Sequence, residues 1–125
     1  MLINEPSTYA AVEQAFDTYE RALTTNDVAT LDALFWQSPH TIRYGATENL
    51  RGYDEIRDFR ARRPSQGLMR TVVERSITTF GDDFATTHIA FTREGEPRVG
   101  RQSQSWARID GNWKVVSAHV SWMDA

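Results

Sequence analysis

The second half of the chain consists of β-rich segments joined by very short turns, and this pattern restricts the fold more than any other feature. Four runs rich in β-branched and aromatic residues follow one another, at 69–80, 83–94, 98–109 and 112–122. Only two or three residues rich in Gly, Asp or Pro separate one run from the next. Because turns this short join antiparallel neighbours, we expect these runs to form an antiparallel meander.

The first half has helical periodicity instead. An amphipathic helix is predicted over about 8–25, capped by Ser7 or Thr8, with acidic residues such as Glu13 and Glu20 on its solvated side. Its buried stripe recurs at spacings of three and four and consists of Val12, Phe16, Tyr19 and Leu23.

Two further helices and one strand are predicted before the meander. Asp27 is expected to cap a second helix that Trp36 closes, and a third helix is expected at 53–63. Between them, "TIRYG" at 41–45 indicates a short strand, and "ATENLRG" at 46–52 indicates a loop. Helices followed by an antiparallel sheet predict one α+β domain over 1–125, in which a curved sheet wraps around the first helices.

Charge and composition exclude some partners. A net charge of −3 and a pI near 5.6 argue against a nucleic-acid binder, which needs a basic face. The basic cluster "RDFRARR" at 57–63 is predicted to be a solvated helix face rather than a phosphate track. All basic residues but Lys114 are arginine, which suits carboxylate recognition and equally suits a GC-rich genome. With no membrane-length apolar run and no signal-peptide pattern, we expect a cytoplasmic protein without membrane contact.

The residue inventory also disfavours several chemistries. The chain has no cysteine, and His40, His88 and His119 lie far apart with no ligand-type residue at metal-binding spacing. Neither a glycine-rich phosphate loop nor a nucleophile-elbow motif occurs. We therefore expect no metal and no cofactor, and the pattern assigns no role to His40 or His88.

The last turn allows a prediction of register. Asp110-Gly111 is a preferred pair for a two-residue type I′ hairpin, which would pair Ile109 with Asn112. When this pairing is continued back from the turn, one face of the hairpin carries the mixture of aromatic and hydrogen-bonding side chains that is typical of a ligand pocket. These residues are Gln102, Gln104, Trp106, Val115, Ser117 and His119. The opposite face is small and suited to packing flat against another sheet or subunit: Ser103, Ser105, Ala107, Val116, Ala118 and Val120. A slip of one residue would exchange the faces.

Two residues outside the hairpin could carry chemistry. Tyr19 lies on the buried stripe of the first helix, where its hydroxyl needs a partner in the core or a ligand. Arg43 lies in the middle of the 41–45 strand, and on a buried face it would need a carboxylate. Glu48 or a bound substrate could supply that carboxylate, and the sequence leaves both open.

Several segments resemble known proteins. The helix order, "TIRYG", "GRQSQSW" and "DGNWKVVSAHVSW" resemble the nuclear-transport-factor-two-like superfamily, the cone-shaped fold of ketosteroid isomerase and the SnoaL-like cyclases. More closely, "YERALTTNDVATLDALFW", "TIRYGATENLRGYDEIRDFRARRP" and "GRQSQSWARI" resemble the AtzH-like family, which includes proteins associated with oxalurate catabolism. The resemblance covers nearly the whole chain.

The resemblance implies a fold and an activity. It implies three helices on a strongly curved, mainly antiparallel sheet, a homodimer through the outer sheet face, and a pocket against the first helix. It further implies a metal-free decarboxylating amidohydrolase that converts a small N-carboxylated urea such as 1,3-dicarboxyurea into allophanate. The nitrogen catabolism concerned would be that of cyanuric acid, purines or oxalurate. The family's pocket tyrosine and arginine correspond to Tyr19 and Arg43.

In this interpretation Arg43 anchors a carboxylate and Tyr19 donates a proton. As hypotheses, five further residues are expected to contact the substrate: Trp36, Gln104, Trp106, Ser117 and His119. The alternative for His119 is a purely structural role. One alternative is a non-catalytic, ligand-binding accessory protein of an amidase. Another is an isomerase or cyclase, which would need a base in an apolar cavity, and the sequence indicates no inward carboxylate.

Overall fold

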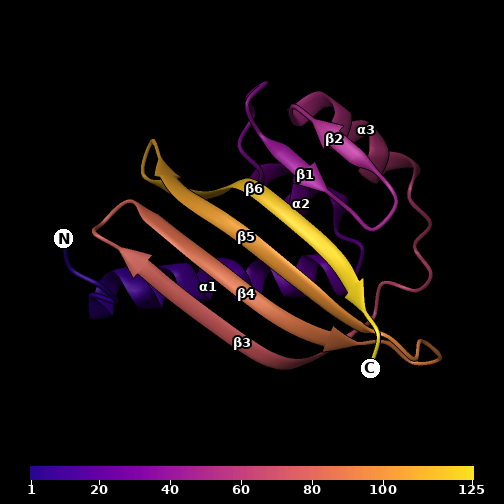
Figure 1. Ribbon diagram of the computed structural model, residues 1–125. Coiled ribbons are helices and arrows are strands. Elements are labelled where there is room, and N and C mark those ends of the chain that lie inside the picture. The colour runs from indigo at the N-terminus through magenta and orange to yellow at the C-terminus, as the bar shows by residue number, and fades with distance from the viewer.

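A computed structural model describes residues 1–125, which form one curved sheet with helices on one side (Figure 1). The strand order is β2, β1, β6, β5, β4, β3, and all neighbours are antiparallel except β1 and β6. The strands are β1 (Ile42–Tyr44), β2 (Asn49–Arg51), β3 (Thr71–Phe80), β4 (Phe84–Thr92), β5 (Val99–Ile109) and β6 (Asn112–Met123). This confirms the predicted α+β class with a mainly antiparallel sheet.

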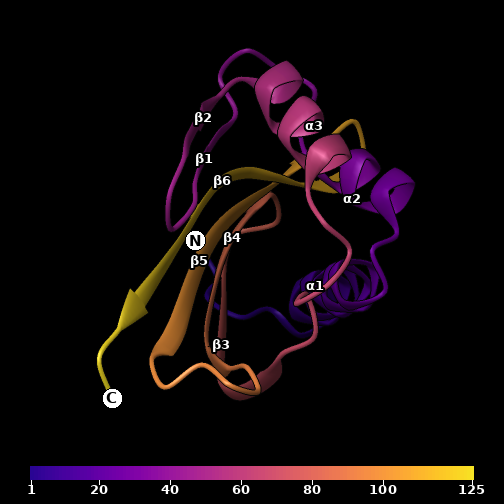
Figure 2. The same ribbon diagram turned by 90° about the vertical axis from the view of Figure 1, so that its right-hand side faces the viewer.

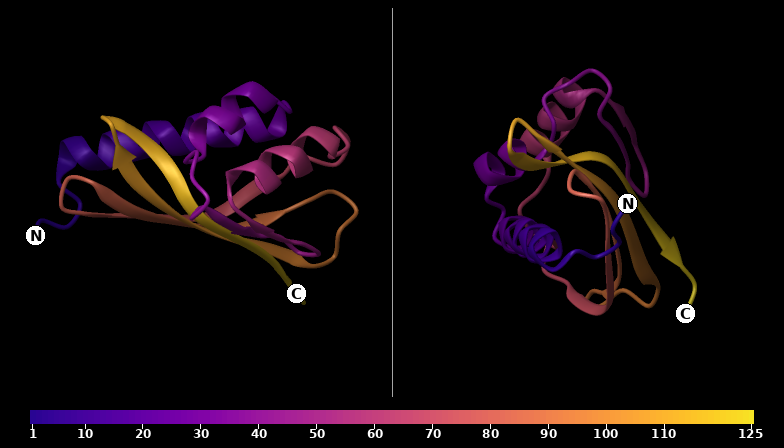
Figure 3. Two further views of the ribbon diagram at one scale, coloured as in Figure 1. Left: turned by 90° about the horizontal axis from the view of Figure 1, so that it is seen from above. Right: turned by 90° about the vertical axis from the view of Figure 1, so that its left-hand side faces the viewer.

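All three helices cover the concave side of the sheet (Figures 2 and 3). They are α1 (Pro6–Thr24), α2 (Val28–Leu34) and α3 (Tyr53–Arg62). The predicted stripe of α1 is buried, from Val12 at 0% exposure to Tyr19 at 5%. It packs with inward side chains of the sheet such as Trp106 and Phe91 to form the core.

Helix α1 begins two residues earlier than predicted. Its cap is Glu5, whose carboxylate accepts hydrogen bonds from the backbone N–H groups of Ser7 (3.1 Å) and Thr8 (2.9 Å). Pro6 occupies the first helical position, where its fixed φ suits a helix and its missing N–H costs nothing. The hydrogen bonds to Ser7 and Thr8 lower the pKa of Glu5 to about 2.

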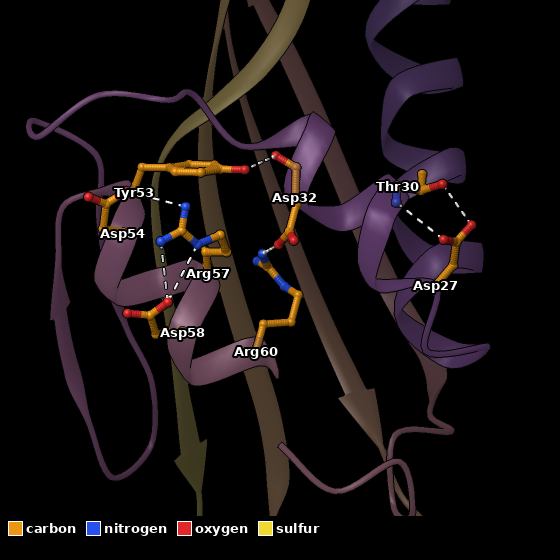
Figure 4. Close-up of polar contacts among 8 residues, drawn as sticks. All are labelled: Asp27, Thr30, Asp32, Tyr53, Asp54, Arg57, Asp58 and Arg60. Carbon is orange, nitrogen blue, oxygen red and sulfur yellow. Dashed lines mark hydrogen bonds and ion pairs between the residues drawn. The ribbon is translucent and has the colours of Figure 1, made fainter. Parts of the chain in front are cut away.

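Helices α2 and α3 are joined by polar contacts at Asp32 (Figure 4). The Tyr53 hydroxyl donates to the Asp32 backbone carbonyl at 3.0 Å, and Arg60 Nη1 donates to the Asp32 carboxylate at 2.5 Å. Arg60 is only 4% exposed, and its guanidinium lies 4.7 Å from the centroid of the Phe35 ring. The prediction of a uniformly solvated face for the basic cluster at 57–63 is therefore wrong at Arg60.

Residues 49–51 form strand β2 rather than part of the predicted loop. This strand pairs with β1, which in turn pairs in parallel with β6. Three residues are too few to show alternation in sequence, so their pairing depends on the tertiary structure.

The β5 and β6 hairpin confirms part of the predicted register. Both Asp110 and Gly111 have positive φ, as a type I′ turn requires, and Ile109 pairs with Asn112. The pairing of Trp106 with Val115 is also as predicted.

A β-bulge then shifts the rest of the hairpin by one residue. Ser105 pairs with Ser117 instead of Val116, so Gln104 pairs with Ala118 and Gln102 with Val120. The prediction that Ser117 shares a face with Gln104 is therefore wrong, because one extra residue on a strand reverses the faces beyond it.

Candidate functional site

A cavity of about 160 Å³ lies between α1, α3 and the concave face of the sheet. Its lining combines apolar and arginine side chains from α1, β1, α3, β5 and β6 and from the loops next to them. The lining residues are Tyr19, Leu23, Arg43, Ala46, Glu48, Phe59, Arg63, Leu68, Arg70, Arg93, Gln102, Val120 and Trp122. Pockets for drug-sized ligands usually hold roughly 300–1,000 Å³, so this cavity suits a small molecule.

Tyr19 reaches the cavity from the buried stripe of α1. Its ring packs edge-on against Trp106, with the centroids 6.5 Å apart, and lies 6.3 Å from the centroid of Phe35. The hydroxyl takes part in none of the side-chain hydrogen bonds of the protein, and it is not one of the fully buried polar atoms without a partner. Tyr19 therefore has a rigidly held ring and a hydroxyl that is free to bind a ligand.

Arg43 points to the same cavity from β1. Its Nη1 donates to Glu48 Oε1 at 2.9 Å, and it makes no other hydrogen bond. Gly45 makes room for this pair, since a Cβ there would lie 1.8 Å from Glu48 Oε1. Glu48 thus orients Arg43 while leaving one edge of the guanidinium for another acceptor.

Glu48 is a weak base in this arrangement. Burial raises its pKa, but hydrogen bonds from Thr47 and Arg43 and the charge of Arg43 outweigh that effect. Its pKa consequently lies below the ordinary value. The sequence left open whether Glu48 pairs with Arg43, and the structure shows this pair. The pair also places a carboxylate in the cavity, where none was expected as a base.

Arg70 forms the second ion pair of the cavity. It binds the Glu20 carboxylate through both Nε and Nη2, and Nη2 also donates to Gln102 Oε1 at 3.2 Å. Its side chain is 2% exposed and its guanidinium lies 4.5 Å from the Phe91 ring centroid. The predicted solvated position of Glu20 is therefore wrong, because this carboxylate neutralises a buried arginine.

Arg63 and Arg93 differ from these two because neither forms an ion pair with a carboxylate. Nε and Nη2 of Arg63 and Nε of Arg93 are buried and have no hydrogen-bond partner. Burial lowers the pKa of both guanidinium groups, and the charges of Arg70 at Arg93 and of Arg43 at Arg63 lower it further. The Tyr19 phenol partly offsets this effect at Arg63, and the Glu20 carboxylate partly offsets it at Arg93. Buried donors without acceptors are costly, and an anion in the cavity would satisfy them.

The cavity therefore carries an excess of positive charge. Four arginines face two carboxylates, those of Glu48 and Glu20, which leaves two guanidinium charges uncompensated. No cluster of three or more histidine, aspartate or glutamate side chains is placed to hold a metal ion. The arrangement is suited to binding a small anion with carboxylate groups, directly through arginine.

None of the five predicted substrate contacts lines the cavity, and three of them, Trp36, Gln104 and Trp106, are held elsewhere by contacts within the protein. Trp106 is fully buried and donates from Nε1 to the Thr87 hydroxyl at 3.0 Å, which in turn donates to Gln104 Oε1 at 3.2 Å. Trp106, held by this hydrogen bond, packs against the ring of Tyr19. Trp36 lies outside the cavity and packs against His40 at 6.2 Å between centroids.

Ser117 and His119 lie on the outer face of the sheet because of the bulge. Both are exposed, and His119 packs edge-on against Tyr44, with 5.7 Å between centroids. His88 is also on this face, with its Nδ1 2.9 Å from the Ser103 hydroxyl. The predicted pocket positions of Ser117 and His119 are therefore wrong.

Sequence reasoning missed most of the arginines of the site. Arg63 belongs to the cluster interpreted as a solvated helix face, and it turns inward because the chain leaves the helix there with an extended φ and ψ. Pro64 was the available signal, since it disfavours helix at the residue before it. Nothing in the local pattern distinguishes Arg93 from the exposed arginines around it.

Four larger hollows lie elsewhere on the surface, and two of them clearly exceed the others in volume. One of about 480 Å³ surrounds the start of α3, and the other, of about 600 Å³, lies between α1, α2 and the tip of the β5 and β6 hairpin. Neither contains a buried, unpartnered charged group. The smaller arginine-rich cavity is therefore the better candidate site.

The architecture defines the class of protein: a cystatin-like, nuclear-transport-factor-2-like (NTF2-like) fold. It is similar to an NTF2-like protein of unknown function from Pseudomonas putida, with 16% identity, coverage of 91% and 87% of the two chains, and a TM-score of 0.76. An NTF2-like superfamily protein from Salmonella enterica gives 22% identity, coverage of 95% and 92%, and a TM-score of 0.73. At these identities the likeness concerns the fold alone.

The chain belongs to the AtzH-like family, whose sequence model matches residues 1–125. It is 50% identical to a protein of unknown function from Pectobacterium atrosepticum, with coverage of 98% and 95% and a TM-score of 0.96. A cystatin-like fold protein from Burkholderia xenovorans is 43% identical, with coverage of 100% and 98% and the same TM-score of 0.96. No curated protein matches the chain. None of its helices has the length and apolar character needed to cross a membrane.

Proposed function

We propose that the protein is a metal-free decarboxylating amidohydrolase that acts on a small N-carboxylated urea such as 1,3-dicarboxyurea. The main support is that Tyr19 and Arg43, distant in sequence, line one small cavity with an excess of positive charge. Membership of the AtzH-like family supports the same reaction. The product would be allophanate, and the role would be in cytoplasmic nitrogen catabolism of cyanuric acid, purines or oxalurate.

The proposed reaction removes one carboxylate as carbon dioxide. Arg43 binds that carboxylate or its neighbouring carbonyl through the guanidinium edge that Glu48 does not use. The bond between the nitrogen and the carboxylate carbon breaks, and its electron pair stays on nitrogen. Tyr19 supplies the proton that this nitrogen takes up, and the resulting phenolate recovers a proton from solvent.

The cavity supports this proton transfer in two ways. The Tyr19 ring is held by Trp106 and Phe35, so its hydroxyl needs little reorganisation to reach a bound nitrogen. Guanidinium groups nearby, Arg63 among them, favour the negative charge that develops on the phenolate.

An isomerase or cyclase with a large apolar substrate fits the cavity less well. The volume of about 160 Å³ is small for such a ligand, and Glu48, the carboxylate in the lining, has a lowered pKa. An accessory protein that binds the same anion for an amidase would use the same arginines. Turnover of the substrate by the purified protein distinguishes an enzyme from this accessory protein.

The test is a turnover assay with 1,3-dicarboxyurea, allophanate and oxalurate on the purified protein. We expect carbon dioxide release from dicarboxyurea, without ammonia, and a loss of about a hundredfold or more in kcat for Tyr19→Phe. Tyr19→Phe should fold normally, because phenylalanine keeps the ring that packs against Trp106 and Phe35 and removes only a hydroxyl that lines the cavity. Absence of turnover by the wild-type protein, together with co-purification of an amidase, would contradict the enzyme and favour the accessory role.

We also propose that a second copy of the chain covers the outer sheet face. Rows of small polar side chains cross this face, for example Thr78, Thr86, Ser105 and Ser117, and Glu74 and Arg101 flank Ala90 at one end. Such a face can pack flat on itself, with Arg101 facing Glu74 of the other copy. The wild-type protein should sediment as a dimer and the Ser105→Arg variant as a monomer. The same sedimentation mass for the wild type and the variant would contradict the proposal.

A further inference from the structure

We propose that Arg63 and Arg93 form a second carboxylate site in the cavity, so that it selects ligands with two carboxylates over those with one. The two guanidinium groups are the uncompensated charges of the lining, and three of their N–H-bearing nitrogens are buried without acceptors. This inference rests on the proposed function only for the identity of the natural ligand. It assigns Arg63 and Arg93 as specificity-determining residues.

Arg93 is held in place by packing rather than by a carboxylate. Its guanidinium lies 5.4 Å from the Phe91 ring centroid and 5.8 Å from that of Trp122. Arg70 uses the same Phe91 ring at 4.5 Å but directs its donors to Glu20 and Gln102. Because Glu20 already accepts from Arg70, the buried donor of Arg93 remains available for a ligand.

Arg63 connects this part of the cavity with Arg43 and Tyr19. Its charge interacts with the Tyr19 phenol and with both Arg43 and Arg93. Arg43 already has Glu48, so a monoanion at Arg43 would leave the donors of Arg63 and Arg93 unsatisfied. A dianion supplies one carboxylate to Arg43 and a second to the Arg63 and Arg93 donors that line the same cavity, and its charge matches the two excess positive charges.

The experiment compares two stable probes, glutarate and butyrate, by calorimetric titration. Glutarate has the same chain length as 1,3-dicarboxyurea and two carboxylates, and butyrate has one. We expect glutarate to bind the wild-type protein at least about ten times more tightly. Arg93→Gln and Arg63→Gln should each weaken glutarate roughly ten- to a hundredfold, the range for a lost charge-assisted hydrogen bond, and change butyrate by less than about threefold.

Arg62→Gln is the matched control, because Arg62 is exposed, adjacent to Arg63 and outside the cavity lining. It should leave both affinities unchanged. Equal binding of the two probes to the wild-type protein would overturn the inference even if a cavity variant failed to fold. So would equal loss of both probes in folded cavity variants.

Two outcomes separate this inference from the proposed function. Selective glutarate binding without turnover of dicarboxyurea would refute the enzyme and keep the dicarboxylate site. Turnover of dicarboxyurea with unchanged kcat and KM in Arg63→Gln and Arg93→Gln would keep the enzyme and refute the site.

Discussion

Replacing Arg43 by lysine tests whether this residue binds substrate through two hydrogen bonds at once. In the free protein only Nη1 is used, by Glu48 at 2.9 Å, so the other nitrogens remain for the substrate. A lysine ammonium is a single donor atom on a flexible stem, and it cannot present a fork to a carboxylate while holding Glu48. The substitution keeps the charge and removes the geometry.

The magnitude follows from the contacts that are lost. One charge-assisted hydrogen bond contributes about 1.5–3 kcal/mol, and each 1.4 kcal/mol is a factor of ten. Loss of one such bond in the transition state therefore predicts a fall of roughly ten- to a hundredfold in kcat/KM, and loss of two predicts more. Stability should change little compared with activity, because lysine keeps the positive charge and can still pair with the partly buried Glu48 carboxylate.

The assay is carbon dioxide release from 1,3-dicarboxyurea, with urea denaturation of the same samples. Arg62→Lys serves as the control, since Arg62 is exposed and forms no ion pair. Wild-type kcat/KM in a folded Arg43→Lys variant would show that Arg43 is a structural partner of Glu48 only. An equal loss in Arg62→Lys would show that the effect is not specific to the cavity.

Three further predictions concern the surroundings of the site and the first helix. Gly45→Ala should displace the Glu48 carboxylate, because a Cβ at residue 45 would lie 1.8 Å from Glu48 Oε1. Arg43 would then be misplaced and KM should rise in steady-state kinetics, so an unchanged KM would contradict the role of Glu48. His119→Ala should keep kcat/KM within about twofold of the wild-type value, because His119 lies on the outer face of the sheet. A large loss of kcat/KM would show that His119 does belong to the site. Glu5 has a folded pKa of about 2 against an ordinary value of 4.5, so its carboxylate contributes stability above pH 4.5 that is lost as the pH falls towards 2. The difference in thermal midpoint between the wild type and Glu5→Gln should shrink over that pH interval, and a constant difference would refute the capping role.

Local patterns in the sequence were sufficient for most of the fold. Apolar residues at spacings of three and four predicted α1, and the two-residue turn at Asp110 predicted the hairpin and its first pairs. These predictions hold because helix periodicity and turn geometry depend on residues close together in the chain. The family resemblance predicted the arrangement of helices on the sheet and pointed to Tyr19 and Arg43, which line the cavity.

Apart from Tyr19 and Arg43, the residues that line the cavity could be identified only from the tertiary structure. The bulge at Val116 moved Ser117 and His119 to the outer face, and no local signal marks one extra residue in a strand of twelve.

The sequence by itself determined the class of fold, the type I′ turn and an arginine-rich composition. Only the tertiary structure decided which arginines are neutralised and which are not. Glu20 and Arg70 are 50 positions apart, and Glu48 is close to Arg43 both in sequence and in space. Because the charge of a cavity is the sum over side chains that folding brings together, Arg63 and Arg93 became candidates for binding an anion only when their buried donors were seen to lack partners.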